Sequence, residues 1–245
     1  MSRDGVYVNL YNSSELNWHL EDGLKLKLRQ TTNYPWSGEI RLTVVPEHAA
    51  QFGIYLRWPG WAQSADVQVN GHSIDISPAR PGSYISVLRK WAPGDVIVLT
   101  LPMQAVPMAA NPRVASDYGR VAIKRGPLVY SLEQMDQNGA ALGDLFVKTS
   151  STAVLEQRKD LLGGITVLKV PGLVAERSLG DELLYQPLTS MVMLAKRPVT
   201  LTFIPYYAFA NREPTPMEVW VPLSRLGDPS YVSSAPVAER RQEPK

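Results

Sequence analysis

The stretch "LKLKLR", from Leu24 to Arg29, alternates an apolar and a basic residue at every position. Successive side chains of a β-strand point to opposite faces, so the three leucines would face a core and the three basic residues would face solvent. The same alternation follows in "EIRLTVVP" at 39–46 and "FGIYLRW" at 52–58. These stretches predict neighbouring strands that each bury one face.

Turn residues separate the predicted strands, as in Pro59-Gly60, Asn70-Gly71 and Pro93-Gly94, and the chain holds 20 prolines and 17 glycines in its 245 residues. Short apolar runs joined by such turns are typical of antiparallel sandwiches. We therefore expect an all-β fold made of two consecutive antiparallel β-sandwich, jelly-roll-like domains.

The stretch "LPMQAVPMAANPRVASDYG" at 101–119 holds three prolines and no sustained alternation, which indicates a domain boundary. We expect a first domain over 1–105, a second over 106–228 and a flexible tail over 229–245. "GRVAIKRGPLVYSLE" and "PVTLTFIPYYAFA" predict strands of the second domain, as does "TSMVMLA" at 189–195. Only "STAVLEQRKDLL" at 151–162 has helix-like content and predicts a short helix or turn.

Charge and hydropathy exclude several classes of partner. The formal net charge is +2 and the basic residues are spread along the chain, so no footprint for nucleic acid or an anionic membrane is present. No run of about 18 apolar residues predicts a membrane span, and "MSRDGVYVNL" lacks the basic and apolar parts of a signal peptide. We expect a soluble cytoplasmic protein.

The sequence offers no recognisable catalytic motif. The absence of cysteine removes thiolate zinc sites and cysteine nucleophiles. Asp95 follows a Pro-Gly turn and predicts a cap on backbone N–H groups, while Glu133 and Asp136 predict a solvated strand end. The three histidines are isolated in the sequence and predict surface residues rather than metal ligands. Candidate acids or bases and isolated histidines are Glu15, Glu21, Asp22, Asp95, Glu133, Asp136, Glu213, Glu218, His19, His48 and His72.

The aromatic residues are the remaining candidates for a site. In "LRWPGWAQSADVQVNG", Trp58 is in phase with Ile54 and Leu56 and is expected to face the core. Trp61 lies beyond the Pro-Gly turn and can either plug the end of the sandwich or stack on a sugar ring. It is the one residue that we predict to bind substrate.

Five motifs in order resemble one family: "NYPWSGEI", "LRWPGWAQSADVQVNG", "GSYISVLRKWAPGDVIVLTLPM", "GRVAIKRGPLVYSLE" and "IPYYAFANREPTPMEVWVP". They are similar to the carboxy-terminal region of glycoside hydrolase family 127, the β-L-arabinofuranosidase-type enzymes. The resemblance runs from near residue 6 to about Pro222. It implies two β-sandwich domains that follow a catalytic (α/α)6 barrel, with residues 1–20 as the linker from that barrel.

The same resemblance places the chemistry outside this chain. In the family a zinc-bound cysteine is the nucleophile and a glutamate is the general acid/base, and all of these residues lie on the barrel. No position here corresponds to them, so we expect no catalytic residue, no metal ligand and no cofactor in this chain. The expected partner is the barrel, in cis or in trans, and a homo-oligomer is a further expectation.

Three interpretations follow. The first is an accessory β-sandwich portion of a glycoside hydrolase acting on β-L-arabinofuranosides or related glycans, inactive alone, which supports the barrel and forms subunit contacts. The second is an independent carbohydrate-binding module, and the third is an enzyme whose two carboxylates face each other about 5–10 Å apart. Under the first, a surface prone to self-association is expected at Val6, Val8, Leu10, Tyr11, Leu16 and Trp18.

Overall fold

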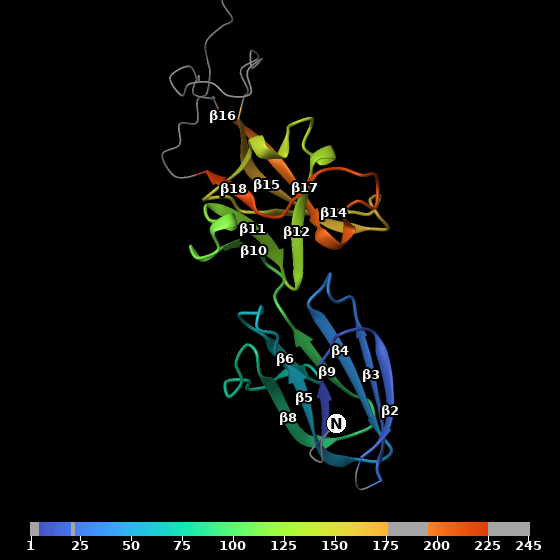
Figure 1. Cartoon of the computed structure of the whole chain (residues 1–245). Coiled ribbons are helices and arrows are strands. Elements are labelled where there is room, and N and C mark those ends of the chain that lie inside the picture. Colours follow the sequence, from blue (N-terminus) through green and yellow to red (C-terminus); the bar gives the residue numbers. More distant parts are fainter. Residues whose placement is uncertain (1–4, 21–22, 176–195, 225–245) are drawn as a thin grey trace, which may run out of the picture. The chain divides into compact units, whose positions relative to one another are not determined.

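The computed structural model describes residues 5–20, 23–175 and 196–224. The chain forms two compact units, the first comprising 1–106 with 124–128 and the second 107–123 with 129–245. Every regular element of the described residues is a β-strand or a single turn of 3-10 helix (Figure 1). The expected all-β class with two β regions is confirmed.

The first unit consists of two sheets. The three-stranded sheet has the order β1-β5-β8 and the six-stranded sheet has the order β2-β3-β4-β9-β6-β7. The β1–β5 pair is parallel, whereas the other described pairs of this unit are antiparallel. The strands are β1 Gly5–Val8, β2 Ser14–His19, β3 Lys25–Thr32, β4 Glu39–Pro46, β5 Ala50–Arg57, β6 Asp66–Val69, β7 His72–Ser73, β8 Tyr84–Trp91 and β9 Asp95–Thr100.

Period-two alternation produces the core of the first unit. Leu24, Leu26 and Leu28 are buried, and the facing positions of β4 are completely buried. The antiparallel register pairs Leu28 with Val44 and so brings apolar side chains to the same face. A single apolar cluster joins both sheets, as expected for a sandwich.

The amino-terminal segment, which was expected to be a linker, is part of the first unit. β1 pairs in parallel with β5, with Val6 opposite Ile54 and Val8 opposite Leu56. Because those partners face the core, Val6 and Val8 are buried with them, and Tyr11 is also buried. Residues 5–8 and 14–19 are therefore strands of the unit itself. Among the six residues expected at the surface, Leu10 is 76% exposed and Trp18 is 46% exposed.

The second unit is built on one nine-stranded sheet. β11 pairs with β18 and also with β12, which closes the path β11-β18-β13-β15-β16-β12 into a six-stranded ring. Closure of this kind removes exposed strand edges from the ring. The strands are β10 Ala105–Ala109, β11 Arg120–Arg125, β12 Leu128–Glu133, β13 Leu145–Lys148, β14 Val154–Arg158, β15 Ile165–Ala175, β16 Lys196–Pro205, β17 Met217–Glu218 and β18 Val221–Ser224.

Of the short helix or turn expected at 151–162, the helix is wrong. Val154–Arg158 is the strand β14, which pairs antiparallel with β15 and places Arg158 opposite Ile165. A turn follows over 159–164, closed by a hydrogen bond from the Gly164 N–H to the Leu161 carbonyl at 2.8 Å. Pairing with a long neighbouring strand outweighs the local helical tendency of such a short stretch. The strand expected at 189–195 and the tail at 229–245 lie outside the described residues.

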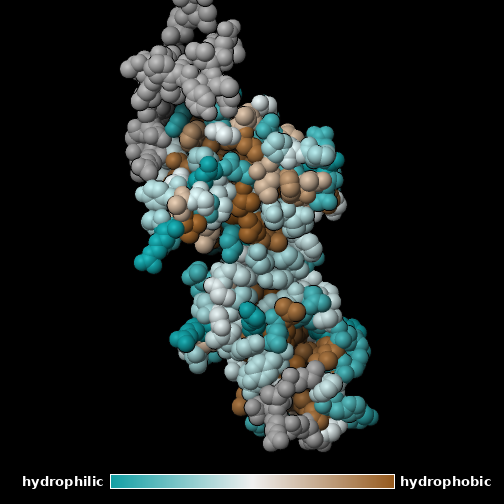
Figure 2. All heavy atoms as spheres, viewed as in Figure 1, coloured by the Kyte–Doolittle hydropathy of each residue, from teal (hydrophilic) through white to brown (hydrophobic). Residues whose placement is uncertain are grey.

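Among the described residues of the second unit, four single turns of 3-10 helix interrupt the strands. They are Ala115–Asp117, Gln134–Asp136, Leu142–Asp144 and Tyr206–Ala208. None of the helical turns among the described residues could span a lipid bilayer. Figure 2 shows apolar side chains interrupting the hydrophilic surface of both units.

Candidate functional site

The two tryptophans of the Pro-Gly bend differ in burial. Trp58 is 7% exposed, and its indole N–H donates to the Ala62 carbonyl at 2.8 Å. The expected inward orientation of Trp58 is therefore confirmed. Its one polar atom is satisfied by the bend that follows β5, so the residue seals that end of the sandwich.

Trp61, the predicted substrate contact, is half-buried. Its ring lies against Tyr34, with centroids 6.5 Å apart and planes inclined by 27°. Tyr34 in turn meets Tyr11 edge-on at 5.8 Å, and Tyr11 donates its hydroxyl hydrogen to the Arg57 carbonyl at 2.5 Å. Trp61 thus belongs to an aromatic chain that extends the core. A role in sugar binding stays a prediction for its exposed part.

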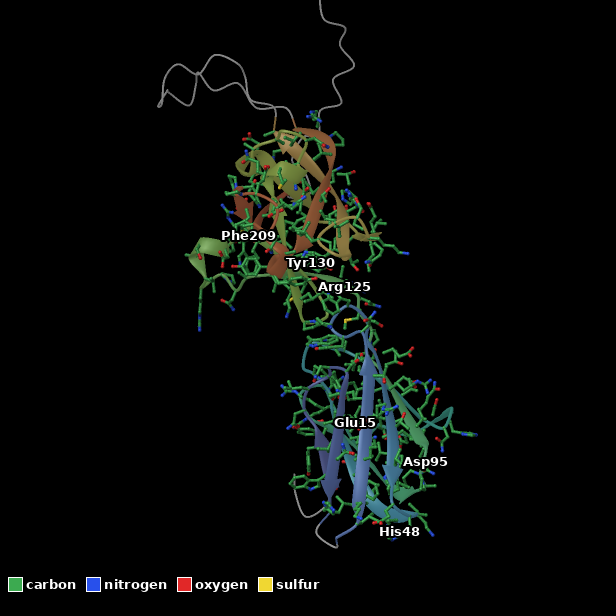
Figure 3. The ribbon with its side chains drawn as sticks, turned by 90° about the vertical axis from the view of Figure 1, so that its right-hand side faces the viewer. Glu15, His48, Asp95, Arg125, Tyr130 and Phe209 are labelled. Carbon is green, nitrogen blue, oxygen red and sulfur yellow. The ribbon has the colours of Figure 1, made fainter. Side chains whose placement is uncertain are left out.

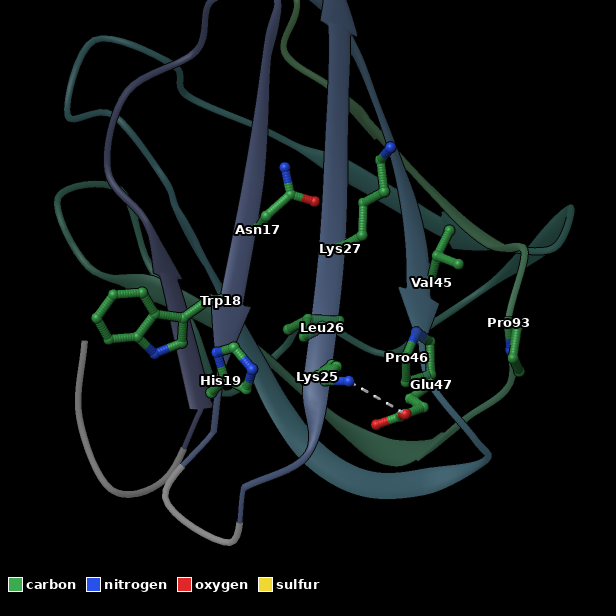
Figure 4. Close-up of a pocket in the computed structure, with 10 residues that line it drawn as sticks. All are labelled: Asn17, Trp18, His19, Lys25, Leu26, Lys27, Val45, Pro46, Glu47 and Pro93. Atoms are coloured by element: carbon green, nitrogen blue, oxygen red, sulfur yellow. Dashed lines mark ion pairs between the residues drawn. The ribbon is translucent and has the colours of Figure 1, made fainter.

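A shallow hollow of about 470 Å³ lies over β2, β3 and β4 of the first unit (Figure 4). His19 and Lys25 line it, and Lys25 pairs with Glu47 at 3.7 Å. Figure 4 shows the ring of Trp18 directed away from this ion pair. His19 therefore shares the hollow with a single carboxylate, and no group of three metal-ligating side chains occurs among the described residues.

The predicted cap at Asp95 is confirmed. One carboxylate oxygen accepts from the Ala92 N–H at 2.9 Å, and the other accepts from the Asn70 side-chain amide at 2.8 Å. The Ala92 N–H is the main cause that holds the pKa of Asp95 below its usual range. Figure 3 labels Asp95 beside the strands of the first unit.

Two further candidate carboxylates are engaged in surface ion pairs. Glu15 accepts from Lys27 at 2.8 Å and from Arg29 at 3.0 Å, and these contacts lower its pKa to about 2. Glu218 pairs with Arg120. Glu213 is exposed, whereas Glu21 and Asp22 lie outside the described residues.

The strongest departure from expectation is at the end of β12. Glu133 was expected at a solvated strand end, yet its side chain is completely buried. Its carboxylate pairs with Arg212, whose guanidinium also donates to both oxygens of Asp136, at 2.8 and 2.6 Å. Hydrogen bonding to Asp136, and then to Glu133, raises the pKa of Arg212 above its usual value. A buried carboxylate requires a charged partner, and the partner of Glu133 is Arg212, which lies almost eighty residues further along the chain.

The same carboxylate also holds the backbone of the segment that carries Arg212. Glu133 accepts from the Ala210 N–H at 2.8 Å, and Ala210 has a φ of +59°. Gln137 is buried nearby and donates to the Glu133 and Thr202 carbonyls, both at 2.9 Å. The segment between β16 and β17 is consequently bound to the end of β12 at several points. We call Glu133, Asp136 and Arg212 the buried ion cluster.

The buried ion cluster does not have the geometry of a glycosidase acid and base. Such enzymes need two carboxylates that face a substrate-filled gap. Here one guanidinium occupies the space between Glu133 and Asp136, and Glu133 has no exposed surface. The arrangement anchors a loop. In the sequence, the stretch "NRE" at 211–213 lies within one of the five family-like motifs, and this was the available sign that Arg212 matters. The residues next to Arg212 in the sequence do not identify its partner.

The comparisons with known proteins agree with both units. The model of the "Beta-L-arabinofuranosidase, GH127 middle domain" matches residues 5–103, and that of the "Glycoside hydrolase family 127 C-terminal domain" matches residues 106–222. A non-reducing end β-L-arabinofuranosidase of Bifidobacterium longum subsp. longum is 34% identical over 205 residues, which are 80% of this chain and 30% of that protein.

Solved structures show the same likeness. The crystal structure of a GH127 β-L-arabinofuranosidase from Geobacillus stearothermophilus T6 superposes with a TM-score of 0.83 at 36% identity, covering 91% of this chain and 34% of that one. A GH127 β-arabinofuranosidase structure gives a TM-score of 0.79 at 32% identity, covering 90% of this chain and 35% of that one.

The fold and the matches define a pair of β domains of a glycoside hydrolase. The chain belongs to glycoside hydrolase family 127 and comprises its middle and C-terminal domains. It spans about a third of the length of these relatives. The resemblance seen in the sequence is confirmed.

Proposed function

We propose that this chain is the accessory β portion of a β-L-arabinofuranosidase-type enzyme, which braces the catalytic barrel and does not hydrolyse glycosides by itself. The observation that carries the proposal is the match of both units to the middle and C-terminal domains of the family. The acid, the base and the nucleophile would then come from the barrel.

The chemistry of the side chains supports this assignment. The chain contains no cysteine, so it does not fit the thiolate zinc centre that the family resemblance implies. The buried ion cluster neutralises Glu133 and Asp136 with Arg212. Asp95 and Glu15 are held by a turn and by surface cations respectively.

The proposal has a direct test. The purified chain is incubated with p-nitrophenyl β-L-arabinofuranoside, and we expect no hydrolysis above the background. The catalytic portion of the Bifidobacterium longum relative is then assayed without its own β domains, alone and with this chain in trans. We expect a higher melting temperature and more activity in the mixture. Hydrolysis by the chain alone at an enzyme-like rate would contradict the proposal.

A further inference from the structure

The connection between β16 and β17 presents aromatic side chains to solvent. Tyr206 and Tyr207 are each 49% exposed, and Phe209 is half-buried beside them. The rings of Tyr206 and Phe209 are nearly parallel, with planes inclined by 5° and centroids 6.5 Å apart. Figure 3 labels Phe209 within the second unit. We call Tyr206, Tyr207 and Phe209 the aromatic surface.

Hydrogen bonds within the segment hold the backbone that carries the aromatic surface. The Phe209 N–H donates to the Tyr206 carbonyl at 3.1 Å, and the Asn211 side-chain amide donates to the Tyr207 and Phe209 carbonyls, each at 3.3 Å. Ala208, between the exposed rings, is only 3% exposed and packs into a small apolar cluster. The middle of the segment is therefore tied down while its aromatic side chains remain outside.

The buried ion cluster fixes the other end of the segment. The completely buried carboxylate of Glu133 binds both the Ala210 N–H and the Arg212 side chain. It therefore holds two of the residues that follow Phe209. Ala210 is in the left-handed region, which costs a non-glycine residue stability. Fixing side chains before a ligand arrives lowers the entropic cost of binding.

We propose that the aromatic surface is a carbohydrate-binding site, at which the C–H face of a neutral saccharide stacks on the ring of Tyr206, which lies parallel to that of Phe209. The exposed aromatic face of Tyr206 suits a flat ring of C–H groups, and its hydroxyl offers a polar partner to the hydroxyl groups of the saccharide. A saccharide carries no charge and so needs no counter-ion from the site. The choice of arabinose-containing glycans as the saccharide rests on the proposed function.

The test is a titration of the full chain, followed by isothermal calorimetry and by the NMR signals of the tyrosine rings. The probes are methyl β-L-arabinofuranoside, a β-linked arabinofuranose disaccharide and, for comparison, xylotriose. We expect saturable binding of the arabinose probes. Tyr206→Ala should weaken it about tenfold, because one stacking partner is lost. The matched control is Tyr118→Ala, which removes another exposed tyrosine of the second unit and should leave the affinity unchanged.

The variant Ala210→Gly tests the positioning role of the segment, which is to hold the aromatic surface in place before a ligand binds. Glycine accepts the same φ without strain, so the melting temperature should not fall, while the freer segment should bind about threefold more weakly. Equal affinity in Ala210→Gly would overturn the positioning role.

No saturable binding of any probe, or an equal loss in Tyr118→Ala, would overturn the site. These binding outcomes do not depend on hydrolysis or on the barrel, so they are separate from a failure of the accessory function.

Discussion

The guanidinium of Arg212 donates to the carboxylate of Glu133, a side chain with no exposed surface, and simultaneously binds Asp136. Removing Arg212 would leave a buried carboxylate without its charged partner. We expect Arg212→Ala to lower the free energy of unfolding of the second unit by about 3 kcal/mol. Urea unfolding followed by circular dichroism measures this change.

The matching control is Arg158→Ala, which breaks an exposed pair with Asp160 and should change the unfolding midpoint little. The double variant Arg212→Met with Glu133→Gln should recover part of the loss, because it removes both charges. Equal stability of Arg212→Ala and Arg158→Ala would contradict the role assigned to the buried ion cluster.

Asp95 predicts an acid dependence of the first unit. Its carboxylate accepts from the Ala92 N–H and the Asn70 amide, and its folded-state pKa lies below the unfolded value. The stabilisation is therefore complete above about pH 4 and is lost as the pH falls through the lower folded-state pKa. We expect Asp95→Ala to cost about 1 kcal/mol at pH 7 and much less at pH 2.

Tryptophan fluorescence is a suitable measurement for that prediction, since Trp220 is the only tryptophan of the sequence outside the first unit. Asp66→Ala serves as a comparison, because the exposed carboxylate of Asp66 accepts from the Gln68 side-chain amide at 3.2 Å. A cost of Asp95→Ala that is the same at both pH values would show that the charge of Asp95 is not involved.

Two glycines of the first unit differ in the space that a side chain would find. A Cβ on Gly38 would lie 1.7 Å from the Leu101 carbonyl oxygen, whereas a Cβ on Gly60 would meet nothing within 4 Å. The backbone of Leu101 is fixed by its own N–H bond to the Gly38 carbonyl at 2.9 Å and cannot move aside. We expect Gly38→Ala to cost about 2 kcal/mol and Gly60→Ala to have little effect, as measured by urea midpoints. Similar midpoints for both variants would contradict this close approach.

Trp58 and Trp61 are expected to respond differently to truncation. Trp58 is nearly fully buried, so Trp58→Ala should cost about 3 kcal/mol, while half-buried Trp61→Ala should cost less. If the predicted sugar contact at Trp61 is real, Trp61→Ala also reduces the calorimetric heat with arabino-oligosaccharides. Unchanged heat in that variant would remove Trp61 from the substrate contacts.

The remaining exposed residues of the amino-terminal segment predict self-association. Leu10 is 76% exposed and Trp18 is 46% exposed, and burial of such side chains between molecules is favourable. We expect a dimeric or larger species in sedimentation velocity at high concentration, reduced in the variant Leu10→Ser with Trp18→Ser. A strictly monomeric parent chain would contradict the prediction. The control Tyr118→Ser alters an exposed aromatic residue elsewhere.

Local pattern was sufficient wherever a residue's environment depends on its immediate neighbours. Alternation placed Leu26 and Leu28 in the core, phase placed Trp58 inward, and the Pro-Gly turn made Asp95 a cap. It was insufficient at Val154–Arg158, where pairing with β15 produced a strand. It was also insufficient at Val6, because the parallel partner that buries it lies almost fifty residues further along the chain.

The sequence by itself determined the all-β class, the strand faces and the family, because period-two alternation, turn residues and ordered motifs are local properties. Only the tertiary structure decided which charges meet. Glu133 looked like a solvated residue until the fold brought Arg212 and the Ala210 N–H to it. The closure of the ring likewise depends on the pairing of β11 with β18, which places Val121 opposite Val221. Such contacts depend on the path of the whole chain, and no short stretch of residues encodes them.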